Sequence, residues 1–153
     1  MNSTDTDIGI LVAHLMREFQ RELYEALHAQ GFTDITPRHG SIFAYLDADG
    51  TRASVLSRRS GVHRQIIGTL IDELENLGYV CRVPDPRDRR AKLVKPTPKG
   101  DAQRVAARDI RNAIETRYRG VLGDTAYEAL VTSIAALTDA IGAFDDGPVG
   151  ETV

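Results

Sequence analysis

The residues best suited to bind an anion lie in a short, proline-rich segment of the chain. Residues 83–100 read VPDPRDRRAKLVKPTPKG, so that Arg87, Arg89 and Arg90 stand close together among prolines and two aspartates. Guanidinium groups bind phosphate oxygens through charge and paired hydrogen bonds. The first two prolines restrict the backbone, and the aspartates are placed to hold neighbouring arginines. The segment therefore predicts a stiff, cationic probe for a polyanion.

Basic and acidic residues are concentrated in different parts of the chain, which the net charge does not show. The net charge is −3 and the isoelectric point is about 5.8, which taken alone argues against a nucleic-acid partner. Yet residues 52–104 contain twelve Lys and Arg against six Asp and Glu, whereas the rest of the chain contains seven against sixteen. This pattern indicates one face that binds a polyanion and an acidic remainder.

Several classes of protein are disfavoured by the sequence. A chain of 153 residues without internal repeats predicts one domain, over residues 1–153. Neither a secretory leader nor an apolar run of about 18 residues is present, so we expect a cytoplasmic protein with no membrane partner. The single cysteine and four scattered histidines predict no disulfide, no metal site and no cofactor. Catalytic signatures such as G-x-S-x-G and H-E-x-x-H do not occur, so we expect no enzyme.

The spacing of apolar residues predicts the elements that must position the cationic side chains. Repeats of three to four residues predict helices over residues 8–27, 37–48, 54–60, 66–77, 98–118 and 127–144. Alternation with a period of two predicts strands over residues 80–83 and 93–95, joined by the basic loop. A short helix, a tight turn, a second helix and a basic hairpin form a winged helix-turn-helix. The expected fold is mainly α-helical with a small β-hairpin wing.

Such a fold explains the basic segment. DNA is densely charged and its minor groove is narrow, so a thin, positive and restrained hairpin suits it. Taken alone, residues 87–92 are equally compatible with a solvated turn. Their place directly after a helix-turn-helix favours DNA binding, with residues 36–100 as the DNA-binding lobe. The other residues divide into helical regions over 1–35 and 101–145, which we expect to form a dimer, and a flexible tail over 146–153.

Several short motifs resemble the MarR family of winged helix-turn-helix transcription regulators. They are Asp85-x-Arg87-Asp88-x-Arg90, Thr97-x-x-Gly100, and Leu74-Glu75-x-x-Gly78-Tyr79-Val80 followed by Arg82. The resemblance is strongest over residues 52–100. It implies a homodimer joined by its terminal helices, which binds double-stranded DNA at a palindromic operator. It also implies a repressor that is released by a small phenolic or anionic ligand, or by oxidation.

The resemblance further implies which residues contact DNA. Five residues at the start of the recognition helix would face base edges, to which Arg and Gln can each form paired hydrogen bonds: His63, Arg64, Gln65, Gly68 and Thr69. In the wing, Arg90 would enter the minor groove with Asp88 orienting it, and Arg82 would lie at the base. Arg87 and Arg89 would bind phosphates. For the residues that flank the turn, a backbone contact and a solvated face are equally expected: Arg52, Ser54, Arg58 and Arg59.

Three positions depart from the family pattern. His63 stands where Ser or Thr often caps the recognition helix, so the cap would come from another group. Gly68 lies inside that helix at a cost of about 1 kcal/mol relative to Ala, either for close approach to DNA or for close helix packing. Pro96 replaces the usual Leu and would stiffen the junction between strand and helix.

The effector site of the family lies between the terminal helices and the winged lobe. Six residues are expected there and would bind a small aromatic or anionic effector: Arg21, Tyr24, His28, Arg38, His39 and Tyr45. Each also has an ordinary interpretation as a core aromatic residue or a partly exposed helix residue. Cys81 alternates with an outward-facing Arg82, so we expect a buried, unreactive thiol rather than a redox sensor.

The sequence leaves one alternative function open. A nonspecific architectural DNA-binding protein would share the wing and its charge, since a fold does not fix a function. A sequence-specific regulator prefers one palindrome over random DNA by orders of magnitude, and an architectural protein does not. The apolar stripes of the terminal helices favour the regulator, because two copies related by a twofold axis would bury them and present two recognition helices.

Overall fold

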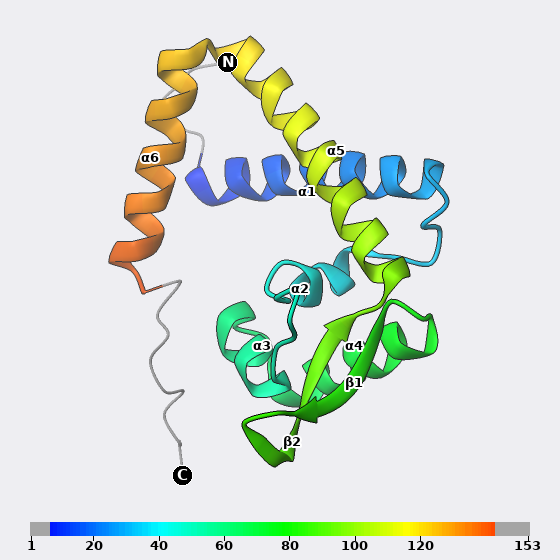
Figure 1. Cartoon of the computed structure of the whole chain (residues 1–153). Coiled ribbons are helices and arrows are strands. Elements are labelled where there is room, and N and C mark those ends of the chain that lie inside the picture. Colours follow the sequence, from blue (N-terminus) through cyan, green and yellow to red (C-terminus); the bar gives the residue numbers. More distant parts are fainter. Residues whose placement is uncertain (1–6, 143–153) are drawn as a thin grey trace.

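The computed structural model describes residues 7–142 and shows a set of helices with one β-hairpin at the lower side of the view (Figure 1). The chain runs through α1 (Ile8–Ala29), a short 3-10 helix η1 (Pro37–His39), α2 (Gly40–Phe43), α3 (Ala53–Ser60), α4 (Arg64–Asn76), β1 (Val80–Asp85), β2 (Asp88–Pro96), α5 (Pro98–Leu122) and α6 (Asp124–Ala140). The predicted mainly α-helical fold with a β-hairpin wing is confirmed. Phe144 and the predicted tail over residues 146–153 lie outside the described residues.

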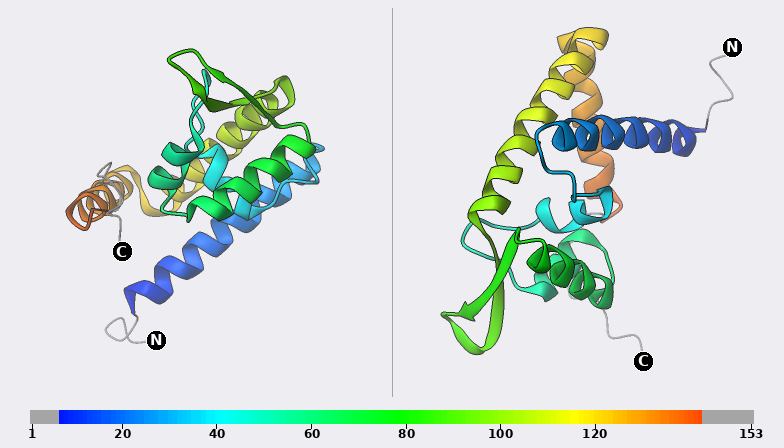
Figure 2. Two further views of the ribbon diagram at one scale, coloured as in Figure 1. Left: turned by 90° about the horizontal axis from the view of Figure 1, so that it is seen from below. Right: turned by 90° about the vertical axis from the view of Figure 1, so that its right-hand side faces the viewer.

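The elements form two groups (Figure 1). Helices α2, α3 and α4 and the hairpin make a lobe, whereas α1 crosses α5, and α6 turns back from the far end of α5. Figure 2 shows α1 extending beyond the lobe from two further directions. The lobe has a core of Ile35, Ile42, Leu46, Leu56, Ile67, Leu70, Ile71, Leu74, Tyr79, Val80 and Val94. A separate core between α1 and α5 consists of Leu23, Leu27, Ala107, Ile110 and Ile114.

The second helix is shorter than the apolar spacing predicts. Helix α2 ends at Phe43, although the expected helix continues to residue 48. The Asp47 N–H donates instead to Thr51 Oγ1 at 2.9 Å, and Leu46 enters the core of the lobe. A side chain that accepts from a backbone N–H offers the chain an alternative to the helix, so the prediction was wrong over the last residues.

Both strands are longer than predicted, so most of the basic segment is strand rather than loop. β1 pairs antiparallel with β2 from Val80 opposite Pro96 to Asp85 opposite Asp88, and the tip consists of residues 86–87. Arg89 and Arg90 therefore lie in β2. Among the described residues the outer edge of β1 has no strand partner, which is where strands tolerate a proline such as Pro84.

Main-chain pairing ties the wing to the rest of the lobe. The Thr51 N–H donates to the Val94 carbonyl at 2.9 Å, and the Val94 N–H donates to the Thr51 carbonyl at 2.9 Å. Both residues are buried, so these hydrogen bonds are shielded from water. The base of β2 is consequently part of the lobe rather than a free hairpin.

The junction between the wing and α5 explains the Thr97-x-x-Gly100 motif. Thr97 caps α5 by accepting the Gly100 N–H at 3.2 Å, and its hydroxyl donates to the Gly78 carbonyl at 2.6 Å. The Thr97 N–H also donates to the Tyr79 carbonyl at 3.0 Å. A Cβ atom on Gly100 would overlap that same carbonyl oxygen. Glycine is required here because the start of α5 and the turn after α4 touch backbone to backbone.

We expect Gly100→Ala to lower the free energy of unfolding by about 1 to 3 kcal/mol, because the backbone must shift to admit a methyl group. Urea unfolding followed by circular dichroism measures the change. Gly120→Ala in the same helix is the control, since a Cβ atom there meets nothing within 4 Å, and it should be neutral or stabilising. A Gly100→Ala protein as stable as its parent would contradict the close approach.

Candidate nucleic-acid interface and effector cleft

The helix-turn-helix consists of α3 and α4 joined by residues 61–63. α3 ends at Gly61, whose φ of 68° is the left-handed conformation that favours glycine. α4 is capped by His63, whose Nδ1 accepts the Gln65 N–H at 3.2 Å. We expected the cap from another group, but the imidazole of His63 itself replaces the usual hydroxyl.

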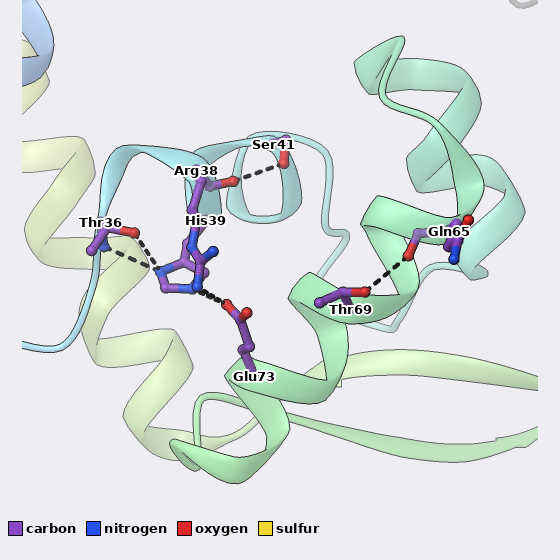
Figure 3. Close-up of polar contacts among 7 residues, drawn as sticks. All are labelled: Thr36, Arg38, His39, Ser41, Gln65, Thr69 and Glu73. Atoms are coloured by element: carbon purple, nitrogen blue, oxygen red, sulfur yellow. Dashed lines mark hydrogen bonds and ion pairs between the residues drawn. The ribbon is translucent and has the colours of Figure 1, made fainter.

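Helix α4 buries one face and exposes the other. Its buried face holds four apolar residues: Ile67, Leu70, Ile71 and Leu74. His63, Arg64, Gln65 and Thr69 are exposed, and the Thr69 hydroxyl donates to the Gln65 carbonyl at 3.2 Å (Figure 3). A Cβ atom on Gly68 would meet nothing within 4 Å, so packing among the described residues does not require glycine there. Close approach of DNA at Gly68 stays a prediction.

The wing is held in shape by its two aspartates. Asp85 is buried, and it accepts the Arg87 N–H at 2.9 Å and the Arg52 Nε–H at 2.7 Å. Asp88 accepts the Arg90 N–H at 3.1 Å. The carboxylates therefore fix the backbone of the tip and an arginine of the lobe, rather than the guanidinium groups of the wing. Arg52 consequently supports the wing from the start of α3.

Ion pairs divide the arginines into two sets. Within residues 7–142, Arg64, Arg87, Arg89 and Arg90 are exposed and form no ion pair. Other arginines each face a carboxylate: Arg21, Arg38, Arg52, Arg59, Arg82, Arg104, Arg108, Arg117 and Arg119. A guanidinium without a carboxylate partner keeps its charge for an external anion. These four arginines lie at the start of α4 and on the wing, whereas Arg17 on α1 and Arg111 on α5 also form no ion pair among the described residues.

The residues predicted around the turn differ in their exposure and in their contacts within the lobe. Ser54 and Arg58 on α3 are exposed. Arg59 is bound within the lobe, because it pairs with Asp47 at 3.0 Å and donates to the Tyr45 carbonyl at 3.3 Å. Contacts of Ser54 and Arg58 with a DNA backbone stay a prediction.

The side chains of Cys81 and Arg82 lie on the opposite faces of β1 from those predicted by the alternation of residues. The register places Arg82 opposite the buried Val94, and directly opposed residues of antiparallel strands share a face. Arg82 thus faces the lobe, where its guanidinium pairs with Asp72 at 2.5 Å and with Glu75 of α4. The expectations of an outward Arg82 and a buried Cys81 were wrong, since the thiol is half-buried on the other face.

A cluster of polar contacts connects the segment before α2 with α4 (Figure 3). His39 is buried, and its Nδ1 accepts the Thr36 N–H at 3.1 Å. The proton of the neutral ring is therefore on Nε2, which donates to Glu73 Oε2 at 3.2 Å. Arg38 Nη2 donates to the same oxygen at 2.5 Å. Since Glu73 belongs to α4, these contacts reach the helix that carries the predicted base-reading residues.

A cleft of about 590 Å³ lies between α1, the α2 region, α4 and α5. Three of the six residues predicted to bind an effector line this cleft: Tyr24, Arg38 and Tyr45. The other three do not. Arg21 pairs with glutamates on the exposed face of α1, His28 Nε2 lies 2.7 Å from the Ile35 carbonyl, and His39 belongs to the Glu73 cluster.

Residues of α5 complete the cleft and were missed at the level of sequence. Gln103, Ala107 and Arg111 line it, four residues apart on one face of the helix. A second cleft of about 710 Å³ shares these three residues and continues along α5 past Arg104 and Arg108. The four-residue spacing could have placed them on one face, but no local signal shows which element that face meets.

No helix within residues 7–142 is long and apolar enough to cross a membrane. Among the same residues, no group of three or more His, Cys, Asp or Glu side chains is placed to hold a metal ion.

The support of the wing by Asp85 depends on pH. The Arg87 N–H, followed by the Arg52 guanidinium, lowers the pKa of the Asp85 carboxyl below its ordinary value. A carboxyl with a lowered pKa stabilises the fold above its ordinary pKa of about 3.9, and this contribution is lost as the pH falls through the folded value. We therefore expect the stability of Asp85→Asn to fall less than that of the parent between about pH 4 and pH 2.

Urea unfolding at a series of pH values measures this difference. Asp49→Asn removes an exposed carboxylate from the turn before α3 and should follow the parent. If the pH profiles of Asp85→Asn and the parent have the same shape, the Asp85 carboxylate does not support the wing.

Comparison with known proteins identifies the family of this fold. Residues 33–91 match the sequence profile of the MarR family. The transcriptional activatory protein BadR of Rhodopseudomonas palustris is 35% identical over 108 residues, which cover 69% of this chain. The match spans 61% of the length of BadR, less than two thirds of that relative.

Solved structures agree with the sequence match. CouR from Rhodococcus jostii RHA1 bound to p-coumaroyl-CoA is 26% identical with a TM-score of 0.74, covering 98% of this chain and 100% of that one. The transcriptional repressor CouR bound to a 23-mer DNA duplex has the same fold, at 23% identity and a TM-score of 0.72, covering 86% of this chain and 92% of that one. These relatives are transcription regulators rather than enzymes. The chain belongs to the MarR family of winged helix-turn-helix transcription regulators.

Proposed function

We propose that this chain is a sequence-specific, ligand-responsive repressor of the cytoplasm, which binds a palindromic operator as a homodimer. The position of four exposed arginines that form no ion pair among the described residues carries the proposal. Arg64 lies at the start of α4, and Arg87, Arg89 and Arg90 lie on the wing. These are the two elements that a winged helix-turn-helix presents to DNA.

The two elements would read DNA in different ways. α4 would lie in the major groove, where Arg64 can pair with guanine and Gln65 with adenine through two hydrogen bonds each. Arg90 would enter the minor groove, whose negative potential attracts arginine where the groove is narrow. Phosphate contacts would come from the other wing arginines and from Ser54 and Arg58 on α3.

A second copy of the chain would cover the apolar surfaces of α1 and α6. No residue of α6 is buried, and both helices expose large apolar side chains: Ile8, Leu11 and Leu15 on α1, and Leu130, Ile134 and Leu137 on α6. Apolar patches of this kind mark interaction surfaces. A twofold pair would bury them and place two copies of α4 on half-sites about 10 base pairs apart, or a multiple of that.

Footprinting on the DNA upstream of the gene that encodes this chain identifies an operator duplex. Fluorescence anisotropy with that duplex then tests the proposed contacts. We expect Arg90→Ala to weaken specific binding by about 1 to 3 kcal/mol without dissociating the dimer. Arg64→Ala should relax the base preference. Arg87→Ala should lower the affinity for all sequences and flatten the salt dependence, because it removes a phosphate contact.

Arg21→Ala is the matched control, since Arg21 is exposed on α1 and already paired with glutamates. It should bind like the parent. Unchanged affinity of Arg90→Ala would refute the wing contact, and equal weakening on all sequences by Arg64→Ala would refute the proposed orientation of α4.

The effector would bind in the cleft of about 590 Å³ and act on α4. Val62, Ile66 and Leu70 line the cleft, so a ligand there would touch the helix-turn-helix directly. Arg38 also lines it and pairs with Glu73 of α4, so an anionic ligand would compete with Glu73 for Arg38. The structure of CouR bound to p-coumaroyl-CoA supports an aromatic, anionic effector.

Loss of the Glu73 carboxylate should partly imitate the effector. We expect Glu73→Gln to weaken operator binding about fivefold or more, a usual size for coupling between two sites, and to reduce further release by p-coumaroyl-CoA. Anisotropy with and without this ligand measures both effects, and thermal melting checks the fold. Glu25→Gln, which removes an exposed partner of Arg21, should change neither. The contrary result is a folded Glu73→Gln protein that binds the operator as tightly as the parent and is released by p-coumaroyl-CoA to the same extent. That result would show that Arg38 does not couple the cleft to α4.

A further inference from the structure

The chain passes between the lobe and the terminal helices α1, α5 and α6 at two places within residues 7–142. It enters the lobe after α1, through residues 30–36, and it leaves the lobe at the start of α5, after Pro96. Both passages lie at the right-hand side of Figure 1, where α4 also ends. Because α4 belongs to the lobe, contacts at these passages orient α4 relative to the terminal helices.

The start of α5 binds three consecutive backbone carbonyls at the end of α4 and in the turn that follows. The Lys99 ammonium donates to the Leu77 carbonyl at 2.9 Å. Thr97 donates to the next two carbonyls, through its hydroxyl to Gly78 at 2.6 Å and through its N–H to Tyr79 at 3.0 Å. Carbonyls near the end of a helix lack partners within the helix, so these donors satisfy them. The end of α4 and the start of α5 are thus held together.

Asp34 joins the first passage to the same place. The Tyr79 hydroxyl donates to Asp34 Oδ1 at 2.5 Å, and Lys99 Nζ donates to Asp34 Oδ2 at 3.3 Å. Lys99 Nζ also lies 4.0 Å from the centroid of the Tyr79 ring, a favourable position for a cation. Tyr79 itself is buried in the core of the lobe. Both passages are therefore bound to one side chain of the core.

The chemistry of these contacts makes the connection stiff. Hydrogen bonds to an ionised group are about twice as strong as those between neutral groups. Burial, followed by the hydrogen bond with Asp34, raises the pKa of Tyr79, so its hydroxyl keeps the proton that it donates. A further contact of α5 with the lobe, from Arg104 Nη2 to the Leu46 carbonyl at 2.8 Å, reaches the α2 region rather than α4.

We propose that Asp34, Tyr79 and Lys99 are positioning residues that fix which separation of operator half-sites the protein accepts. The inference rests on the proposed function, in which two copies of α4 bind one palindrome, and it names what sets their spacing. One added base pair moves a half-site by about 3.4 Å along the duplex and turns it by about 35°. A stiff connection cannot follow both changes, so it rejects the altered duplex. A loose connection adapts, but the cost of ordering it weakens binding to the preferred duplex.

Lys99→Met tests the inference on the operator duplex and on two duplexes with one base pair inserted or deleted between the half-sites. Anisotropy gives a Kd for each duplex, and the ratio of altered to operator Kd measures the selection of spacing. We expect a ratio of about ten or more for the parent and a ratio about fivefold smaller for Lys99→Met, a usual size of effect within one network of contacts. A smaller folded fraction weakens binding to all duplexes equally and leaves the ratio unchanged.

Three further variants separate spacing from affinity and charge. Arg21→Met removes a positive charge from the exposed face of α1 and should keep the parent's ratio. Arg90→Ala should weaken binding to all three duplexes by a similar factor. Lys99→Arg restores a cation and should recover most of the selection of spacing.

Tyr79→Phe provides a second test should Lys99→Met fail to fold. It removes the hydroxyl that binds Asp34, keeps the ring in the core, and should also lower the ratio. A folded Lys99→Met or Tyr79→Phe protein with the parent's ratio would overturn the inference and leave the proposed function standing. A parent that binds its operator but all three duplexes equally would overturn it as well. If the parent prefers no palindrome over random DNA, the proposed function fails, and the inference fails with it.

Discussion

One buried carboxylate holds the wing against the helix-turn-helix. Asp85 binds the Arg52 guanidinium at the start of α3 and the backbone N–H of Arg87 at the tip. Without such ties the wing would be an isolated two-stranded hairpin, which is marginally stable in water. The main-chain pairing of Thr51 with Val94 and the ion pairs of Arg82 with α4 also hold the wing against the helix-turn-helix. The spacing between α4 and the wing is thus set before any DNA is bound, which lowers the ordering cost of binding.

The distribution of carboxylates explains how an acidic protein can present a cationic surface. Arg59, Arg82 and Arg117 each pair with a carboxylate, whereas Arg64 at the start of α4 and Arg87, Arg89 and Arg90 toward the tip of the wing form no ion pair among the described residues. The net charge of −3 therefore describes the whole chain and not the face proposed for DNA. A local positive field of this kind steers a polyanion to one surface, and salt screens the effect.

Much of the fold could be predicted from the sequence, because apolar periodicity records which face of a helix is buried. The stripe that includes Ile67, Leu70 and Leu74 located α4, and the apolar stripe over residues 98–118 located α5. The faces of β1 could not be predicted in this way. A slip of one residue exchanges the two faces of a strand, and the apolar residues of β1 occur at both parities, so Arg82 was placed on the wrong side.

Some parts of the candidate site could likewise be predicted from the sequence, and others could not. Local signals were enough for the recognition helix and the wing, since both are continuous in sequence. The effector cleft joins α1, the α2 region, α4 and α5, and contacts between distant segments leave no local pattern. For that reason half of the expected effector residues lie elsewhere, and the residues of α5 that complete the cleft were not predicted. The cap of α4 by His63 likewise follows from the observed geometry of the turn and not from residue type.

The central claim is that this surface reads a DNA sequence rather than charge alone. Selection of bound duplexes from a random pool, with the full-length chain at physiological salt, tests it most directly. We predict a palindromic consensus with half-sites about 10 base pairs apart or a multiple of that, each read by one copy of α4. A bound pool that stays as random as the input, despite tight binding, would contradict the claim and identify an architectural DNA-binding protein instead.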